Sequence, residues 1–259
     1  MDFVRYVKRE LVHQNIAALQ IGLGIGVSAK TLLDSGFEVD IAEIDPVIYD
    51  YAIKYFNLPQ PRNSTLTFTL VFIGDGRYFV EKIASNPSYD YVLHDIFTGG
   101  YVEPSLFSVE FFTAIKRILK PDGVLAVVII SVTQNYVGHP ASIATKTVVA
   151  TLKKVFKNVV CYLEIPGESE QNITIYATSF GDEIEFDFKQ NDINLKDEMY
   201  LRTRKSFSTQ PRLELDLNGV GPISDNVNPL KALQYPSAVA HWKIVRKVFP
   251  NSLLWTEYF

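Results

Sequence analysis

Acidic side chains stand at the ends of three apolar runs in this sequence. Glu43 and Asp45 end one run, Asp75 follows a second, and Asp95 follows a third. A carboxylate in such a place can accept hydrogen bonds from a pair of hydroxyls, or it can orient an amine and accept its proton. These acids are therefore the first candidates for chemistry.

A glycine-rich turn precedes the first of these acids by about 20 residues, the spacing that a strand-helix-strand unit requires. The sequence QIGLGIG places Gly22, Gly24 and Gly26 between an apolar run and a helix-forming segment. Such a turn lets the backbone approach a ligand, and Glu43 and Asp45 would then face the hydroxyls of a ribose. Val27 replaces the third glycine of the dinucleotide fingerprint, so we expect a nucleoside without a diphosphate. A plain turn without a ligand and an NAD-dependent oxidoreductase are the weaker alternatives.

Alternating strands and helices must position these residues. We predict helices and strands over the following ranges: strands 17–21, 38–44, 65–73, 89–95, 124–131, 158–165 and 172–179, and helices 28–34, 46–56, 77–84, 108–119 and 142–155. This alternation predicts an α/β protein with one sheet that is parallel except at its end. The carboxyl ends of its strands would bring the glycines and the acids to one edge.

Composition allows one large core, or one core with a smaller appendage. The chain has 259 residues, of which 47% are hydrophobic, and a formal net charge of −4, which does not favour nucleic acid as a partner. The single Cys161 favours a reducing compartment, and we expect the cytoplasm. No apolar run reaches the roughly 18 residues of a membrane span. We expect residues 1–180 to form the nucleoside-binding domain and 181–259 to form an extension packed on it, with a homodimer left open.

Both termini are expected to be helical. Residues 1–14 have the charge distribution of an amphipathic helix, which we expect to cover one edge of the first strand. Residues 238–249 form a second amphipathic pattern, in which Trp242 is expected to pack as an apolar anchor.

Five motifs in order resemble the spermidine synthase-like branch of the class I S-adenosylmethionine-dependent transferases. They are QIGLGIG, AEIDP, IGDGRYFV, YDYVLHDIFTGG and LKPDGVLAVVI, with a weaker match in SDNVNPLKALQ. The resemblance implies a Rossmann-like, seven-stranded, mostly parallel sheet of the methyltransferase type with a C-terminal appendage. It also implies S-adenosylmethionine or its decarboxylated form as cofactor. The three glycines would hold its amino-acid tail, Glu43 its ribose, and the turn of Asp75 and Gly76 its adenine.

Two departures from the family pattern bear on the reaction. In the aminopropyltransferases of the family that this chain resembles, an acid occupies the position of Ile25, and a second acid occupies the position of Thr98. Binding a diamine requires paired carboxylates, because burying ammonium groups is costly. We therefore expect methyl transfer to a small-molecule amine or a protein, with aminopropyl transfer and a non-catalytic binding or scaffolding domain as alternatives.

Asp95 is the predicted catalytic residue, since it ends a buried strand at the ligand edge. Thr98 and Tyr101, in the loop that follows, are the predicted substrate-binding residues. Strand alternation points His94 away from Asp95, so we expect a packing role for it. The histidines and the cysteine lack the spacing of a metal site, and we predict no bound metal.

Overall fold

A single seven-stranded sheet organises the part of the chain that the structure describes. The computed structural model describes residues 2–9, 15–59, 70–84, 88–96, 102–131, 140–163, 171–187 and 212–233, together with 201, 205, 235, 238, 239, 243 and 246. The strands are β1 (Ala17–Ile21), β2 (Glu38–Glu43), β3 (Val71–Ile73), β4 (Tyr89–His94), β5 (Leu119–Ser131), β6 (Asn158–Leu163) and β7 (Gln171–Thr178).

The strand order is β3-β2-β1-β4-β5-β7-β6. Every pairing is parallel except the two made by β7, which runs antiparallel to both β5 and β6. The predicted fold class, a mostly parallel seven-stranded sheet of the methyltransferase type, is confirmed. The order reverses between β1 and β4, and ligands bind at such a switch point in open α/β sheets.

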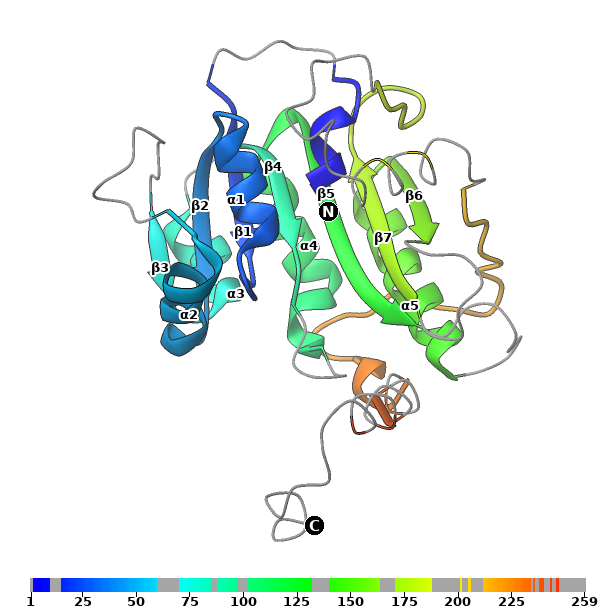
Figure 1. The fold of residues 1–259 in the computed structure, drawn as a ribbon. Coiled ribbons are helices and arrows are strands. Elements are labelled where there is room, and N and C mark those ends of the chain that lie inside the picture. The colour runs from blue at the N-terminus through cyan, green and yellow to red at the C-terminus, as the bar shows by residue number, and fades with distance from the viewer. Residues whose placement is uncertain are drawn as a thin grey trace, which may run out of the picture.

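Helices cover both faces of the sheet (Figure 1). They are η1 (Asp2–Tyr6), α1 (Val27–Asp34), α2 (Pro46–Phe56), α3 (Gly76–Tyr78), η2 (Phe79–Ile83), η3 (Pro104–Phe107), α4 (Val109–Ile118) and α5 (Pro140–Val155). Apolar residues of η1, α1 and α2 pack on one face, and those of η2, α4 and α5 pack on the other. Because both faces are covered, the central strand β4 is buried along its whole length.

A buried ion-pair network lies at the amino end of β4. Asp90 is fully buried and accepts hydrogen bonds from Arg9 (2.7 Å), Lys120 (2.7 Å) and the backbone N–H of Ala17 (2.7 Å). Burial alone would raise the pKa of Asp90, but these donors together lower it below its usual range. The network therefore ties the N-terminal segment to β1 and β5, at the opposite end of the strands from the predicted site.

The N-terminal prediction was partly wrong. Residues 2–6 form the short helix η1, which packs on a face of the sheet with the apolar residues of α1, and residues 10–14 lie outside the described residues. Neither edge of β1 is open, because β2 and β4 pair with its two sides. The C-terminal helix predicted over 238–249 also falls largely outside the described residues.

Two local predictions need correction. The strand predicted over 124–131 begins earlier, because residues 120–123 already belong to β5, whose pairing with β4 shifts register between Tyr89 and Tyr91. The helix predicted over 77–84 is divided into α3 and the π-helical turn η2. Both differences concern hydrogen-bond register, which sequence periodicity does not specify.

The described part of the C-terminal extension packs against the sheet domain. Leu213 donates its N–H to the carbonyl of Cys161 in β6 (2.9 Å), and Ile223 donates its N–H to Thr151 Oγ1 of α5 (2.9 Å). Leu215, Leu217 and Leu230 join the core on the side of α4 and α5. In Figure 1 this segment, coloured orange near residue 225, reaches the lower side of the molecule, where the arrow of β5 ends.

Candidate nucleoside site at the carboxyl edge

The glycine turn after β1 is in direct contact with the end of β4. Gly22 has φ +76°, and a Cβ atom at this residue would lie 2.2 Å from the carbonyl oxygen of Asp95. The N–H of Asp95 in turn donates to the carbonyl of Ile21 (2.9 Å). Two residues that the sequence predicted for one site, 73 positions apart, are thus neighbours, and only glycine fits between them.

Gly24 and Gly26 occupy different surroundings. Gly24 is exposed with φ +54°, and a Cβ there would meet no atom within 4 Å. Gly26 is buried beneath Leu58 and Ala52 and precedes the first residue of α1. The space beside Gly24 is therefore open, whereas Gly26 packs against side chains of α2 and the residues that follow it.

Glu43 is held beside this turn by two backbone hydrogen bonds. Its Oε2 accepts from the N–H of Leu23 (2.7 Å), its Oε1 accepts from the N–H of Asp45 (2.9 Å), and the residue is only 6% exposed. A carboxylate oxygen has a second lone-pair site, so each oxygen retains acceptor capacity. The geometry fixes a hydrogen-bond acceptor where the predicted ribose site requires one.

The remaining acids have mainly capping roles in the structure. Asp45 accepts a hydrogen bond from the N–H of Val47 and caps α2, so it does not share the position of Glu43 as the sequence suggested. Asp75 caps α3 by accepting from the N–H groups of Arg77 (2.7 Å) and Tyr78 (3.4 Å). Asp75 is exposed at the carboxyl edge, and the capping bonds fix the direction of its carboxylate.

Gly76 begins α3 immediately beside β1. A Cβ atom at Gly76 would lie 2.6 Å from Ile21 Cγ2, so this glycine lets the turn of Asp75 approach the end of β1. Asp95 is half-buried at the end of β4. Thr98 and Tyr101, the predicted substrate-binding residues, lie outside the described residues.

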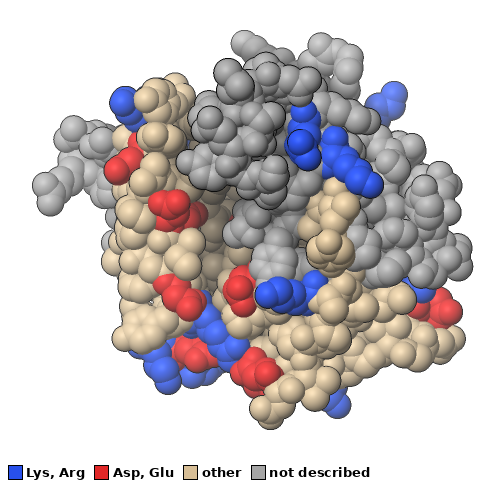
Figure 2. Space-filling model, turned by 90° about the horizontal axis from the view of Figure 1, so that it is seen from below, with Lys and Arg blue, Asp and Glu red and all other residues tan. Residues whose placement is uncertain are grey.

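Large apolar side chains surround these acids and remain unusually exposed. Ile25 is 50% exposed, Ile44 70% and Ile73 42%, and they stand at the glycine turn, after Glu43 and before Asp75. Figure 2 views this side of the molecule and shows acidic side chains at several places on it. Apolar surface next to fixed carboxylates is the combination that a nucleoside requires, with a flat apolar base and a polar sugar. The residues present therefore fit a nucleoside cofactor.

Gln20 is a contributor that the sequence prediction missed. Its side chain is 1% exposed and donates from Nε2 to the carbonyl of Gly22 (2.7 Å), while its Oε1 has no hydrogen-bond partner among the described residues. The signal was present, because a glutamine interrupts the apolar run AALQI. The hydrogen bond from the Gln20 amide to the Gly22 carbonyl therefore helps to fix the glycine turn.

His94 has the packing role expected of it. Its imidazole is fully buried and lies edge-on to Phe107, with 4.7 Å between ring centroids, and also contacts Phe111 and Phe112. Burial lowers the pKa of His94 to about 4. The ring is therefore neutral near pH 7 and does not serve as a base beside Asp95.

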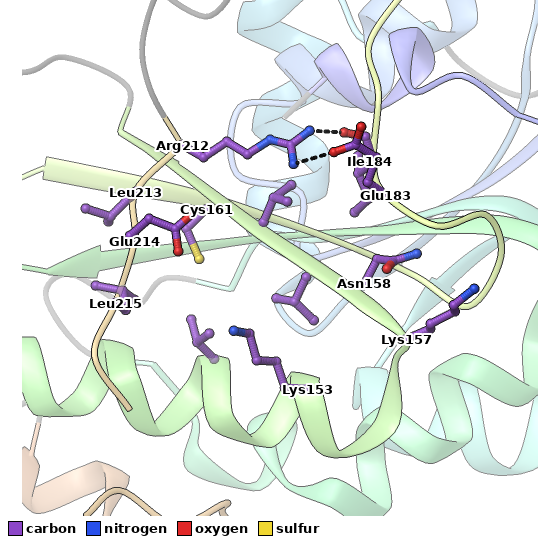
Figure 3. Close-up of a pocket in the computed structure, with 13 residues that line it drawn as sticks. Lys153, Lys157, Asn158, Cys161, Glu183, Ile184, Arg212, Leu213, Glu214 and Leu215 are labelled. Carbon is purple, nitrogen blue, oxygen red and sulfur yellow. Dashed lines mark hydrogen bonds and ion pairs between the residues drawn. The ribbon is translucent and has the colours of Figure 1, made fainter. Parts of the chain in front are cut away.

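A separate pocket of roughly 440 Å³ lies by α5 and β6 (Figure 3). Its lining includes Lys153, Cys161, Arg212 and Glu214, and none of the predicted site residues. Burial raises the pKa of the Cys161 thiol to about 12, which leaves it protonated and unreactive near pH 7. Among the described residues, no group of three or more acidic, histidine or cysteine side chains could hold a metal ion.

The family of the chain follows from a comparison with known protein families. The model of the spermine/spermidine synthase domain matches residues 9–189, a range that includes the glycine turn, Glu43, Asp75 and Asp95. The chain belongs to the spermine/spermidine synthase domain family. The resemblance predicted from five motifs is confirmed.

Two curated relatives illustrate the range of this family. The chain is 32% identical over 257 residues to an N-terminal histidine N-methyltransferase of Emericella nidulans, covering 90% of this chain and 43% of the relative. It is 32% identical over 160 residues to a polyamine aminopropyltransferase of Vibrio vulnificus, covering 61% of this chain and 48% of the relative. The chain thus spans less than half the length of either relative.

Solved structures support the fold. A probable spermidine synthase from Corynebacterium glutamicum superimposes with a TM-score of 0.60 at 17% identity, covering 82% of this chain and 72% of that one. Among the helices that the structure describes, none combines the length and apolarity needed to cross a bilayer. The two chains therefore share a fold, although their residues differ at most aligned positions.

Proposed function

We propose that this chain is an S-adenosylmethionine-dependent N-methyltransferase that acts on the N-terminal histidine of a protein. The observation that carries the proposal is the share of this chain over which it is similar to each relative. The histidine N-methyltransferase relative matches 90% of this chain, which includes part of the C-terminal extension, whereas the aminopropyltransferase relative matches 61%. The acceptor named for the first relative is therefore the best guide to the acceptor of this chain.

The glycine turn supports methyl transfer over aminopropyl transfer. Ile25 projects from the turn with half of its surface exposed, at the position where the aminopropyltransferases carry an acid that holds the amine. An isoleucine offers no compensation for burying an ammonium group. The replacement of the family's acid by Ile25 thus lies on the exposed side of the predicted cofactor site.

In this proposal, one group of residues binds the cofactor and Asp95 orients the acceptor. Glu43 would accept hydrogen bonds from the ribose hydroxyls, the space beside Gly24 would admit the amino-acid tail, and Asp75 would receive the adenine amino group. When bound, the cofactor supplies an electrophilic methyl carbon, to which the acceptor nitrogen bonds as the sulfur–carbon bond breaks and its electron pair leaves with the thioether. Asp95 would orient the acceptor nitrogen and accept its proton.

Competing acceptors and donors test this function. Full-length protein is incubated with S-adenosylmethionine labelled in its methyl group and a synthetic peptide that begins with histidine, and in parallel with the same peptide extended by one N-terminal glycine. We expect label in the first peptide only. Aminopropylation of putrescine from the decarboxylated cofactor, with no label in either peptide, would replace this proposal by the aminopropyltransferase. Failure of calorimetry to detect binding of either cofactor would favour a non-catalytic binding domain.

Two variants separate binding from chemistry. Asp95→Asn should retain cofactor affinity while turnover falls by about 10²- to 10⁴-fold, the usual contribution of a positioned proton acceptor. Glu43→Gln should weaken cofactor binding by roughly tenfold, because a neutral amide is a poorer acceptor than a carboxylate. Glu38→Gln, at the amino end of the same strand, is the matched control and should change neither quantity.

The cellular setting is a proposal from composition alone. The single cysteine of the sequence, Cys161, which is buried, supports a cytoplasmic protein. A homodimer and a role with polyamines stay predictions, which sizing chromatography and the putrescine reaction would test.

A further inference from the structure

Helix α2 presents a row of large apolar side chains to solvent. Val47, Ile48, Tyr51 and Tyr55 are spaced as i, i+1, i+4 and i+8, which places them on one face of the helix. Each of them is between 36% and 58% exposed. These four residues are called the α2 stripe below.

The opposite side of α2 attaches the helix to the sheet. Of the 11 residues of α2, Ala52 alone is buried, and Tyr49 and Ile53 pack partly buried against the core on the side of α1. Figure 1 shows the helix at the end of the molecule where β3 is the last strand. The α2 stripe therefore takes no part in the core of this chain.

The outward face of α4 has a different character. Its exposed residues are polar or charged, namely Glu110, Thr113, Lys116 and Arg117. Such a face is the ordinary solvent-exposed side of an amphipathic helix. An exposed apolar patch of a few hundred Å² is instead typical of an interaction surface.

The area of the α2 stripe can be compared with that of a dimer interface. With about 150–250 Å² for a large side chain, the four residues together expose roughly 300–450 Å². Each partner in a standard interface buries about 800 Å², of which about 65% is apolar in homodimers. The α2 stripe thus provides more than half of the apolar area that one copy of this chain would contribute.

Two oppositely charged residues flank the α2 stripe on one side. Asp50 follows Val47 by three residues, and Lys54 follows Tyr51 by three, so both lie beside the stripe on the same side. Lys54 Nζ lies over the ring of Tyr55, 4.9 Å from its centroid. Neither charged group has an ion-pair partner among the residues that the structure describes.

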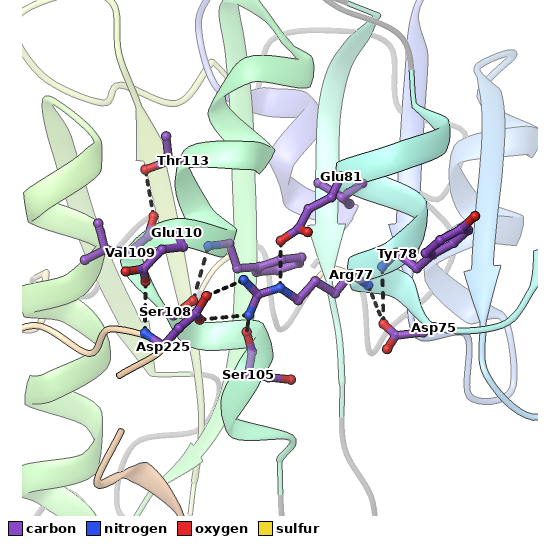
Figure 4. A network of polar contacts seen from close by, with 12 residues as sticks. Asp75, Arg77, Tyr78, Glu81, Ser105, Ser108, Val109, Glu110, Thr113 and Asp225 are labelled. Carbon is purple, nitrogen blue, oxygen red and sulfur yellow. Dashed lines mark hydrogen bonds and ion pairs between the residues drawn. The ribbon is translucent and has the colours of Figure 1, made fainter. Parts of the chain in front are cut away.

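Charged residues of two neighbouring helices are paired within the chain. Lys30 and Asp34 of α1, four residues apart like Asp50 and Lys54, form an ion pair (2.6 Å). Arg77 of α3 donates to both oxygens of Asp225 (2.8 and 2.6 Å), as Figure 4 shows. The charges beside the α2 stripe are therefore available to a partner.

We propose that the α2 stripe is the contact surface between two copies of this chain, whose α2 helices pack antiparallel about a two-fold axis. With the axis at the level of Ala52, Asp50 of each copy lies level with Lys54 of the other, because each stands two residues, about 3 Å, from the axis. The same flank of two antiparallel helices meets across the axis, so the contact contains this ion pair twice. Such a dimer does not depend on the proposed methyl transfer.

Sedimentation velocity of the full chain at increasing concentration measures the association. We expect a monomer–dimer equilibrium for the parent protein, and a dimer Kd raised at least about 100-fold by Tyr51→Glu, which places a charge at the centre of the contact. Tyr235→Glu is the matched control and should associate like the parent, since Tyr235 lies outside α2 and is 68% exposed. A parent that stays monomeric, or a Tyr51→Glu variant that dimerises as tightly as the parent, would overturn the proposal.

Exchanging the flanking charges tests the antiparallel arrangement. Asp50→Lys alone sets two lysines against each other, and Lys54→Asp alone sets two aspartates against each other, so each should weaken its homodimer by about tenfold or more. An equimolar mixture of the two variants should associate about as tightly as the parent, because every contact then joins opposite charges. A mixture that associates no better than either variant alone would refute the two-fold contact.

Neutral phosphatidylcholine vesicles distinguish a second copy from a lipid surface. The parent, Tyr51→Glu and Tyr235→Glu are each sedimented with the vesicles, and we expect none of them to bind. Vesicle binding by a monomeric parent that Tyr51→Glu loses and Tyr235→Glu keeps would assign the α2 stripe to lipid and overturn the dimer. Circular dichroism should show unchanged helix content in every variant, because each substituted side chain is exposed.

Discussion

Replacing Gly22 by alanine should destabilise the protein through one identifiable contact. Its Cβ would lie 2.2 Å from the Asp95 carbonyl oxygen, more than about 1 Å closer than an ordinary contact. Either the turn or the end of β4 must move. The hydrogen bonds on either side, from Gly22 N–H to the Ala42 carbonyl and from Asp95 N–H to the Ile21 carbonyl (both 2.9 Å), oppose that movement.

The expected magnitude is the sum of two effects. Overpacking costs typically 1–3 kcal/mol, and a lost or weakened backbone hydrogen bond about 1 kcal/mol more. The free energy of unfolding should therefore fall by roughly 2–4 kcal/mol beyond the cost of placing alanine at a positive φ, which is about 1–2 kcal/mol. Gly36→Ala isolates that second cost, because Gly36 has φ +83° and no atom within 4 Å of its would-be Cβ.

Urea unfolding of the two variants, followed by circular dichroism, measures the difference. The structure predicts that Gly36→Ala unfolds at a moderately lower urea concentration and Gly22→Ala at a much lower one. Calorimetry should also show that Gly22→Ala has lost cofactor affinity, since the turn and Asp95 are displaced together. If the unfolding free energies of the two variants agree within about 1 kcal/mol, the contact does not constrain the turn and the reasoning fails.

Three further predictions concern neighbouring features. Burial lowers the pKa of His94 to about 4, so the unfolded chain binds a proton first as the pH falls. Stability should therefore decrease by about 3 kcal/mol from pH 6.5 to pH 4, and a His94→Phe variant should lack most of this decrease in pH-dependent urea titrations. Asp90→Asn leaves Lys120 without its carboxylate partner, while Arg9 keeps Asp122, and should cost about 3 kcal/mol; a loss under 1 kcal/mol in the same assay would show that the network contributes little. Gly24→Ala should unfold like Gly36→Ala yet bind cofactor at least about tenfold more weakly, and unchanged affinity would place the ligand tail elsewhere.

Most of the fold could be predicted from the sequence because its signals are local. Apolar runs of strand length alternate with helical periodicity, and Pro46 marks the start of α2 where the structure has it. The errors occurred where hydrogen-bond register decides the outcome, as in residues 120–123 of β5 and in the π-helical turn η2. The N-terminal segment was harder still, because η1 packs with residues of α1 that lie far from it in the sequence.

The sequence by itself determined the kinds of groups at the site. It placed glycines after one strand and acids at the ends of three others, and parallel strands bring such positions to one edge. Only the tertiary structure decided how these groups are used. It set Gly22 against Asp95, assigned Asp45 to capping, and joined Arg77 to Asp225 across 148 residues. Such pairings depend on how layers pack and how side chains reach between them, and neither periodicity nor spacing along the chain encodes that geometry.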